Sequence, residues 1–261
     1  MYIDLVDPYQ ERNSALHRLD PRVKAVVTLV YVLAVGLTPQ GAWVPFAAFL
    51  AFVLVASYFA KLGWSFTLRR SFVALPFMLA ALAIPFVTPG PPMIELPVLG
   101  WTVTETGLVR FLSILLRAWL AVQTAILFTA TTAFTDLLWA LRSLRLPKVL
   151  VAMLGFMYRY LFVLLDEAQR MIRARAARSP RSPGSARPSI GWQARVTGSM
   201  VGSLFLRALE RSERVFAAMA SRGYDGEVRS LVRFRMVSVD WIMLLGGSMI
   251  LVSILTLALV V

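Results

Sequence analysis

Two short segments of the chain share a pattern that suits docking onto another protein. Ala177-Arg178-Ser179 and Ser221-Arg222-Gly223 each place one arginine between two small residues at the end of an amphipathic stretch. A guanidinium stays charged and can bond a carboxylate through two N–H groups, and small neighbours let the backbone approach closely. The pattern therefore predicts contacts with partner chains. The alternative is that each arginine only satisfies the last carbonyl groups of its own helix.

The other residue types that could do chemistry argue against catalysis. His17 is the only histidine, and its neighbours Arg18 and Arg22 make it a poor metal ligand, so we expect it to pack within the N-terminal segment. The chain has no cysteine and hence no thiolate ligand or cysteine nucleophile. It has no G-x-x-x-x-G-K-[ST] loop for ATP. We expect no catalytic, cofactor-binding or metal-binding residue in this chain.

Two further arginines, Arg110 and Arg117, lie in an otherwise apolar stretch, seven residues apart and so near one face of a helix. Charged residues at such positions face the protein interior or extend to the membrane surface. We expect them either to contact another subunit or to form a structural ion pair, for instance with Glu105.

Composition places these residues in a membrane protein. The chain has 261 residues, of which 58% are hydrophobic, and its mean hydropathy is +0.70. That balance is far above the usual value for a soluble domain. At roughly 20 residues per span, the length accommodates about five spans and one extramembrane region. The polar start, residues 1–20, lacks a signal-peptide core, so the first hydrophobic helix is expected to direct its own insertion.

Apolar runs and their flanking residues locate the spans. Asp20 and Pro21 suit the N-cap and first position of the first helix. The third run contains Pro76 and Pro85, so we expect it to be bent or broken. The loop 88–107 is rich in proline and glycine and is expected to hold a short interfacial segment near 94–101. The predicted spans are residues 23–37, 42–60, 72–87, 108–133 and 241–261.

The loop charges predict the orientation. Lysines and arginines precede the first span and occupy residues 61–70, whereas the loops at 39–41 and 88–107 have none. The positive-inside rule therefore places the N-terminus inside, the C-terminus outside and residues 136–239 in the cytoplasm. The resulting division is residues 1–135, 136–239 and 240–261.

Residues 136–239 carry most of the net charge. They hold 18 of the 27 lysines and arginines and 7 of the 14 acidic residues, so their net charge is +11 out of a total of +13. Basic residues here are not interleaved with aromatic residues as on nucleic-acid platforms, which argues against a nucleic-acid partner. Part of the charge is expected to attract anionic membrane lipid.

The same region should contain two long amphipathic helices, joined by a flexible linker at residues 180–193. Apolar residues recur at helical spacing over 149–178 and over 194–221. The stretch 149–165 is apolar except for Arg159; it is either a sixth span or, as we favour, a helix buried against the other spans. We expect Asp136 to be a helix N-cap and Gly223 a left-handed C-terminal cap.

These features together resemble a known family. The N-terminal sequence Ser14-Ala15-Leu16-His17-Arg18-Leu19-Asp20-Pro21-Arg22-Val23-Lys24, the spans and the two terminal arginine motifs resemble the transmembrane T component of energy-coupling-factor transporters, over essentially the whole chain. The family motif is Ala-Arg-Gly. Here Ser179 replaces the glycine of the first motif, and Ser221 replaces the alanine of the second.

The resemblance implies a function and a set of partners. It implies an all-α polytopic membrane protein with about five spans and long cytoplasmic coupling helices, in a prokaryotic cell membrane. Its partners would be two ABC-type ATPases, which bind the ATP, and a substrate-binding integral membrane S component. Arg178 and Arg222 would dock into the ATPases. The N-terminal sequence looks most like the cobalt-type importers, and nickel or a vitamin is the alternative cargo.

Two other classes of function remain open at this point. A self-sufficient secondary transporter would need broken helices and ionisable groups at mid-membrane, for which Pro76 and Pro85 give slight support. A membrane-embedded enzyme would need paired carboxylates or a nucleophile with its base, and the sequence shows no such constellation.

Overall fold

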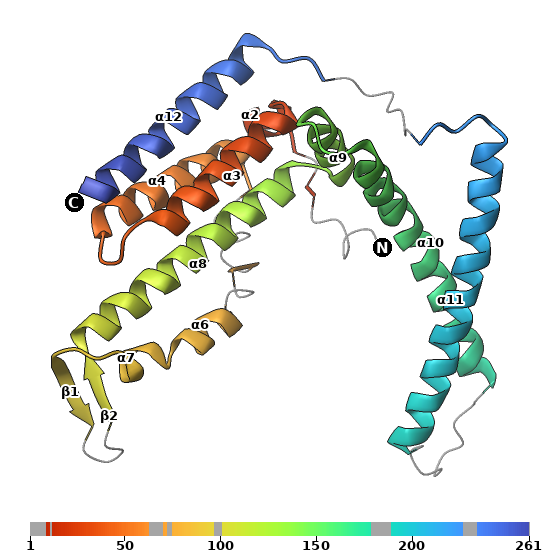
Figure 1. Cartoon of the computed structure of the whole chain (residues 1–261), viewed down its shortest axis with the longest axis horizontal. Coiled ribbons are helices and arrows are strands. Elements are labelled where there is room, and N and C mark those ends of the chain that lie inside the picture. Colours follow the sequence, from red (N-terminus) through yellow and green to blue (C-terminus); the bar gives the residue numbers. More distant parts are fainter. Residues whose placement is uncertain are drawn as a thin grey trace. The chain divides into compact units, whose positions relative to one another are not determined.

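A computed structural model describes residues 9–10, 12–62, 70–71, 75–96, 101–178, 189–226 and 234–260 of the chain (Figure 1). Two compact units make up the fold: residues Met1–Leu144 with Val232–Val261, and residues Arg145–Leu231. The described part is helical, as the sequence predicts, apart from one small hairpin. Several predictions fall outside the described residues: Ser179, most of the linker (180–188), the start of the third span (72–74) and part of the 94–101 segment (97–100).

The first unit is a bundle around four helices: α3 (Pro21–Leu37), α4 (Trp43–Ala60), α8 (Glu105–Thr131) and α12 (Ser238–Val260). Its core centres on Tyr31 of α3, which is fully buried. The Tyr31 ring packs edge-on against Phe49 at 5.5 Å, and its hydroxyl donates to the Phe49 carbonyl oxygen at 3.1 Å. That bond satisfies the phenol where water is excluded. The same cluster contains Ala34, Val35, Phe46, Val53, Leu120 and Leu251.

The outer faces of this bundle stay apolar. Leu245, Met249 and Leu259 of α12, for example, are all more than half exposed. A helix that is apolar on all sides and has one exposed face is suited to contact with membrane lipid. By length and composition, α4, α8, α12 and, in the second unit, α10 (Lys148–Arg178) can cross a membrane. The predicted first span, α3, has 17 residues.

The start of α3 follows the prediction. Asp20 is the N-cap, its carboxylate accepts from the Arg22 amide at 2.9 Å, and Pro21 stands at the first turn. Buried Asp240 joins the first turn of α12 to the start of α3. Its carboxylate accepts from the Asp20 amide at 3.1 Å and from the Val237 amide at 2.9 Å. One carboxylate thus joins segments that lie at opposite ends of the sequence.

The proline-containing third run is broken, as predicted. Its described residues form α6 (Leu75–Ala81) and α7 (Ile84–Val87), with Pro85 in the first turn of α7. In the loop that follows, β1 (Pro92–Leu96) and β2 (Trp101–Thr104) pair as an antiparallel hairpin, which the sequence does not predict. The interfacial location of residues 94–101 stays a prediction. Thr104 then caps α8 by accepting from the Gly107 amide, so α8 begins three residues before its predicted start.

The prediction that Asp136 is a helix N-cap is wrong. The short helix α9 (Phe134–Ser143) has Ala133 as its N-cap, and Asp136 lies inside its first turn. An acidic residue is still favourable there because the amide dipoles of the first turn point toward it. Burial raises the pKa of Asp136, and the charge of Lys24 opposes that shift.

The second unit consists of two long helices, α10 (Lys148–Arg178) and α11 (Ile190–Ala220). The first agrees with the predicted bounds to within a residue. The second begins at Ile190 rather than 194, because Ser189 caps it by accepting from the Trp192 amide at 3.3 Å. The residues at 190–193 therefore belong to the helix and not to the predicted linker.

Candidate functional site

The helices α10 and α11 cross each other in opposite directions (Figure 1). Their contacts run in reverse order along the two sequences. Phe156 of α10 meets Tyr224, just after α11, with ring centroids 6.4 Å apart. At the other end, the guanidinium of Arg175 lies 3.5 Å from the Thr197 hydroxyl. The pair is therefore antiparallel.

A charged cluster joins the helices between these two contacts. Glu167 of α10 accepts from Arg207 of α11 at 2.5 Å and from Arg170 of its own helix at 2.9 Å. The carboxylate is largely covered, with 15% of its side chain exposed, whereas both arginines are 60% exposed. One glutamate thus links the two helices near their crossing.

The end of α11 forms a well-defined turn around the second arginine motif. Gly223 has a φ of +77°, the left-handed conformation predicted for it. The Tyr224 amide donates to the Met219 carbonyl and the Gly223 amide to the Ala220 carbonyl, both at 3.0 Å. These are the two bonds of a Schellman motif. They satisfy helix carbonyls with backbone amides, so the side chain of Arg222 is not needed for that purpose.

The end of α10 is held by a different set of contacts. Arg175 lies over the Trp192 ring of α11, 5.6 Å from its centroid. Arg178, the last residue of α10, is exposed, as is Ala177. Ser179 is outside the described residues. The structure therefore presents Arg178 on the surface beyond the point where Arg175 contacts α11.

The two motif arginines lie at opposite ends of the crossed pair. Arg222 lies two residues before Tyr224, whose ring contacts Phe156 in the first half of α10, whereas Arg178 is the last residue of α10. At 1.5 Å per residue, Phe156 and Arg178 are about 33 Å apart along α10. The structure therefore does not bring the two motifs together into one site; it separates them by roughly the width of a small domain.

Much of the apolar surface of the pair is uncovered. Among its described residues only Ala152 is buried, while Val149, Met157 and Phe216 are each more than half exposed. A groove of about 410 Å³ lies between the first half of α10 and the second half of α11. Exposed apolar surface of this extent indicates contact with a protein or a membrane. The groove is lined by Met153, Phe156, Met157, Tyr160, Leu164, Ala208, Arg211, Ser212, Val215 and Met219.

Arg110 and Arg117 of α8 have different environments. The Arg117 guanidinium donates to the carbonyl oxygen of Thr38, the C-cap of α3. It therefore supports the end of a neighbouring helix, where a cation is favourable. Arg110 is exposed, and within the described part of the chain it forms no salt bridge with Glu105.

His17 packs within the N-terminal segment, in the role that the sequence predicts. Its ring nitrogens lie 2.7 Å from the Ser14 hydroxyl and 2.9 Å from the Gln10 carbonyl oxygen. Burial lowers the pKa of His17, and the charges of Lys24 and Arg12 also lower it. The hydrogen bond with the Gln10 carbonyl oxygen opposes this shift.

Sequence reasoning missed the residues that join α10 to α11. Glu167 and Arg170 have the i, i+3 spacing of a helix-surface pair, which gives a local signal. The contacts of Glu167 with Arg207 and of Phe156 with Tyr224 depend on the crossing of two helices, and no pattern along one helix contains that information.

Comparison with known proteins gives a consistent result. A family model described as the cobalt transport protein CbiQ matches residues 12–234. The energy-coupling factor transporter transmembrane protein EcfT of Leuconostoc gelidum is 30% identical over 238 residues, which are 87% of this chain and 85% of the relative. The EcfT of Listeria innocua is 27% identical over 88% of this chain and 87% of the relative.

A relative with a more specific name is the cobalt transport protein CbiQ of Rhodobacter capsulatus, which is 29% identical over 76% of this chain and 75% of that protein. The family model spans most of the chain, and the helical fold with long apolar helices agrees with it. The chain belongs to the CbiQ family and is a non-catalytic, multi-pass transmembrane component, the T component, of an energy-coupling-factor transporter.

Proposed function

We propose that Arg178 and Arg222 each dock into a separate ABC-type ATPase subunit, and that α10 and α11 transmit the movement of the ATPases to a substrate-binding membrane S component. The observation that carries this proposal is the placement of the two arginines at opposite ends of one crossed helix pair. Two contacts about 33 Å apart suit two partners better than one socket.

The uncovered apolar surface supports the second part of the proposal. The groove between α10 and α11 is lined by methionines and aromatic residues, which adapt readily to different partner surfaces. An S component that binds on this side would be moved when the ATPases change the crossing of the helices.

The proposed orientation places the N-terminus and residues 136–239 on the cytoplasmic side, where the ATPases bind ATP. The concentration of lysine and arginine in these segments supports it. The membrane is the cell membrane of a prokaryote, in keeping with the bacterial sources of the EcfT relatives.

The proposed cargo is the cobalt ion, with nickel or a vitamin as the alternative. The description of the family model and the name of the Rhodobacter capsulatus relative support cobalt. The described residues contain no group of three or more potential metal ligands, so in this proposal the ion binds to the S component as substrate. Metal analysis of the native complex tests it: bound cobalt supports the proposal, whereas a vitamin or nickel without cobalt contradicts it.

The docking role is tested by the double variant Arg178→Glu, Arg222→Glu. Reversal of both charges should place carboxylates where the ATPases are proposed to bind a guanidinium, so we expect the ATPases no longer to co-purify with the chain and uptake to fall to background. Co-purification from mild detergent and transport in vesicles measure the two effects.

The matched control is Arg173→Glu with Arg214→Glu. These exposed arginines lie on α10 and α11 but not at their ends, and their reversal changes the net charge equally. The control should retain ATPase binding. Equal loss in both variants would show a general effect of charge, and normal uptake by the first variant would reject the docking role.

A further inference from the structure

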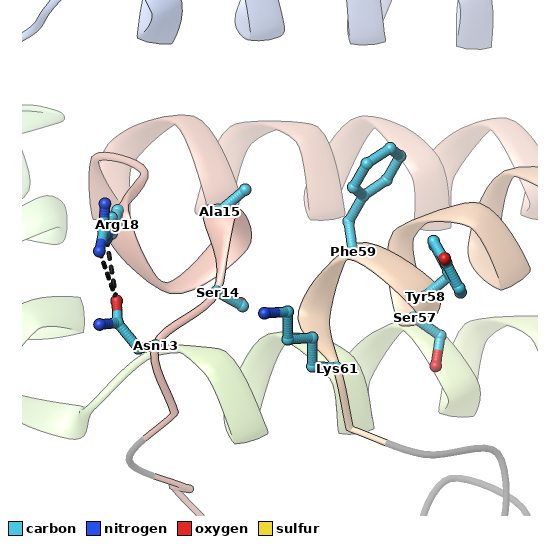
Figure 2. A pocket seen from close by; sticks show the side chains of 8 residues that line it. All are labelled: Asn13, Ser14, Ala15, Arg18, Ser57, Tyr58, Phe59 and Lys61. Atoms are coloured by element: carbon cyan, nitrogen blue, oxygen red, sulfur yellow. Dashed lines mark hydrogen bonds between the residues drawn. The ribbon is translucent and has the colours of Figure 1, made fainter.

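A second concave site lies in the first unit. It is formed between α2 (Ala15–Arg18), with the residues just before it, and the C-terminal end of α4. Its volume is about 690 Å³. Figure 2 shows the side chain of Lys61, which follows α4, extending toward Ser14, with Tyr58 and Phe59 on the α4 side.

The charge of this pocket is positive. Arg18 and Lys61 line it, and none of the described residues that line it is acidic. Arg18 donates from Nε and Nη2 to the Asn13 side-chain oxygen at 3.0 and 2.7 Å, which fixes the guanidinium and leaves other N–H groups for a ligand. Within the described part of the chain, neither cation forms an ion pair with a carboxylate.

A third cation, Arg12, adds positive charge at this end of α4. The Arg12 guanidinium donates to the Lys61 carbonyl oxygen. A helix C-terminus carries partial negative charge on its last carbonyl groups. The bond from Arg12 offsets that charge, so an anion can approach Lys61 with less repulsion from the helix end.

A membrane-spanning α4 would place this pocket at the level of the lipid headgroups. The pocket opens at the end of α4, an apolar helix long enough to span the membrane. Tyr58 is 70% exposed and Phe59 55% exposed beside the two cations. Exposed aromatic residues next to basic residues at the end of a span are typical of the membrane interface, and basic pockets at that level bind lipid phosphates.

We infer that this pocket binds a phosphate group, and that its source is the headgroup of an anionic phospholipid. Arg18 and Lys61 contact the phosphate, while Tyr58 and Phe59 lie against the glycerol and upper acyl region. A free phosphate ion would use the same two cations but not the aromatic residues. The inference requires only that α4 spans the membrane and does not depend on the docking of the ATPases.

The test is native mass spectrometry of the full chain in mild detergent, titrated with phosphatidylglycerol, phosphatidylcholine of the same acyl chains, or inorganic phosphate. We expect phosphatidylglycerol to bind more tightly than phosphatidylcholine. The variant Arg18→Gln, Lys61→Gln should bind phosphatidylglycerol on the order of tenfold more weakly, with little change for phosphatidylcholine.

Two other variants keep the test decisive. Arg195→Gln with Arg235→Gln removes two exposed arginines outside the pocket and should bind like the original chain. Arg18→Lys with Lys61→Arg preserves both charges and should retain binding. If the variant Arg18→Gln, Lys61→Gln does not fold, Lys61→Gln alone replaces it, because Lys61 is exposed.

The outcomes separate the two sources of phosphate. Inorganic phosphate that binds the original chain and displaces the lipid would support the phosphate site with the free ion as an additional ligand. Equal binding of the two lipids, or equal weakening in the pocket variant and its control, would overturn the proposal.

Discussion

Arg222 and Arg178 differ in how firmly the backbone holds them. Arg222 precedes Gly223, whose positive φ permits the Schellman turn, and Tyr224 then packs on Phe156 of α10. Arg178 ends its helix, and the nearest described contact with α11 is made by Arg175. The Arg-Gly pair in the second motif is therefore a structural unit in which the glycine fixes the position of the arginine.

Gly223→Ala tests this role of the glycine. A Cβ at this position meets no atom within 4 Å, but the φ of +77° is strained for alanine, at a cost of about 1 kcal/mol. We expect the amides at residues 223 and 224 to exchange hydrogen roughly fivefold faster, and coupling of ATP hydrolysis to uptake to weaken. Hydrogen-exchange mass spectrometry and transport assays measure these effects.

Gly198→Ala provides the matched control. Gly198 also lies in open space, but inside α11 and without a positive φ. Alanine has the higher helix propensity, so this change should stabilise α11 slightly. The proposed role of Gly223 is wrong if both substitutions have the same effect.

At the scale of the elements, the proposed coupling depends on how α10 crosses α11. The contacts at the two ends of the pair are aromatic or single hydrogen bonds, whereas Glu167 forms charged bonds with arginines on both helices. We therefore expect Glu167 to act as a positioning residue for the two ends of the pair.

Glu167→Gln should remove the charge-assisted link while leaving Arg178 and Arg222 available for docking. We expect both ATPases to remain bound, and uptake per ATP hydrolysed to fall several-fold because movement at one end is transmitted less well to the other. Parallel measurement of ATPase co-purification, ATP hydrolysis and uptake separates binding from coupling.

Glu213→Gln is the control for this substitution, because Glu213 is an exposed glutamate of α11. It should have little effect on any of the three measurements. Loss of ATPase binding in Glu167→Gln would contradict a role in coupling alone, and unchanged uptake would contradict any role for the crossing.

The sequence predicts most elements because their signals are local. Apolar periodicity and the residues Asp20 and Gly223 locate the ends of helices with little error. Other features depend on contacts between segments. The hairpin of β1 and β2 requires pairing across a loop, and the crossing of α10 and α11 requires side chains from both helices. The start of α11 differs from its prediction because its cap, Ser189, directly follows a proline-rich stretch that is typical of a linker.

The sequence identifies the residues of the candidate site but does not predict how they are arranged in space. The arginines are found from their small neighbours and their positions at helix ends. Their separation by about 33 Å follows from the antiparallel crossing, which the contacts of Phe156 with Tyr224 and of Arg175 with Thr197 establish. Likewise, the sequence does not distinguish Arg117 from Arg110, whereas the structure places Arg117 against the end of α3.

At the scale of the whole molecule, the two units differ in what they need from other molecules. The membrane bundle has its own buried core around Tyr31 and Phe49. The crossed pair has almost no buried residues in its described part and exposes many large apolar side chains. We therefore interpret the second unit as one whose hydrophobic contacts are completed by partner proteins or by the membrane.

The most direct test of the central claim is cross-linking from the two motif positions in the native complex. The chain has no cysteine, so Arg178→Cys and Arg222→Cys each introduce a single reactive position. With a short heterobifunctional reagent, each variant should cross-link to one ATPase subunit, and the double variant should give a species that contains two. Cross-links from both positions to the same ATPase molecule, or to no ATPase at all, would contradict the account.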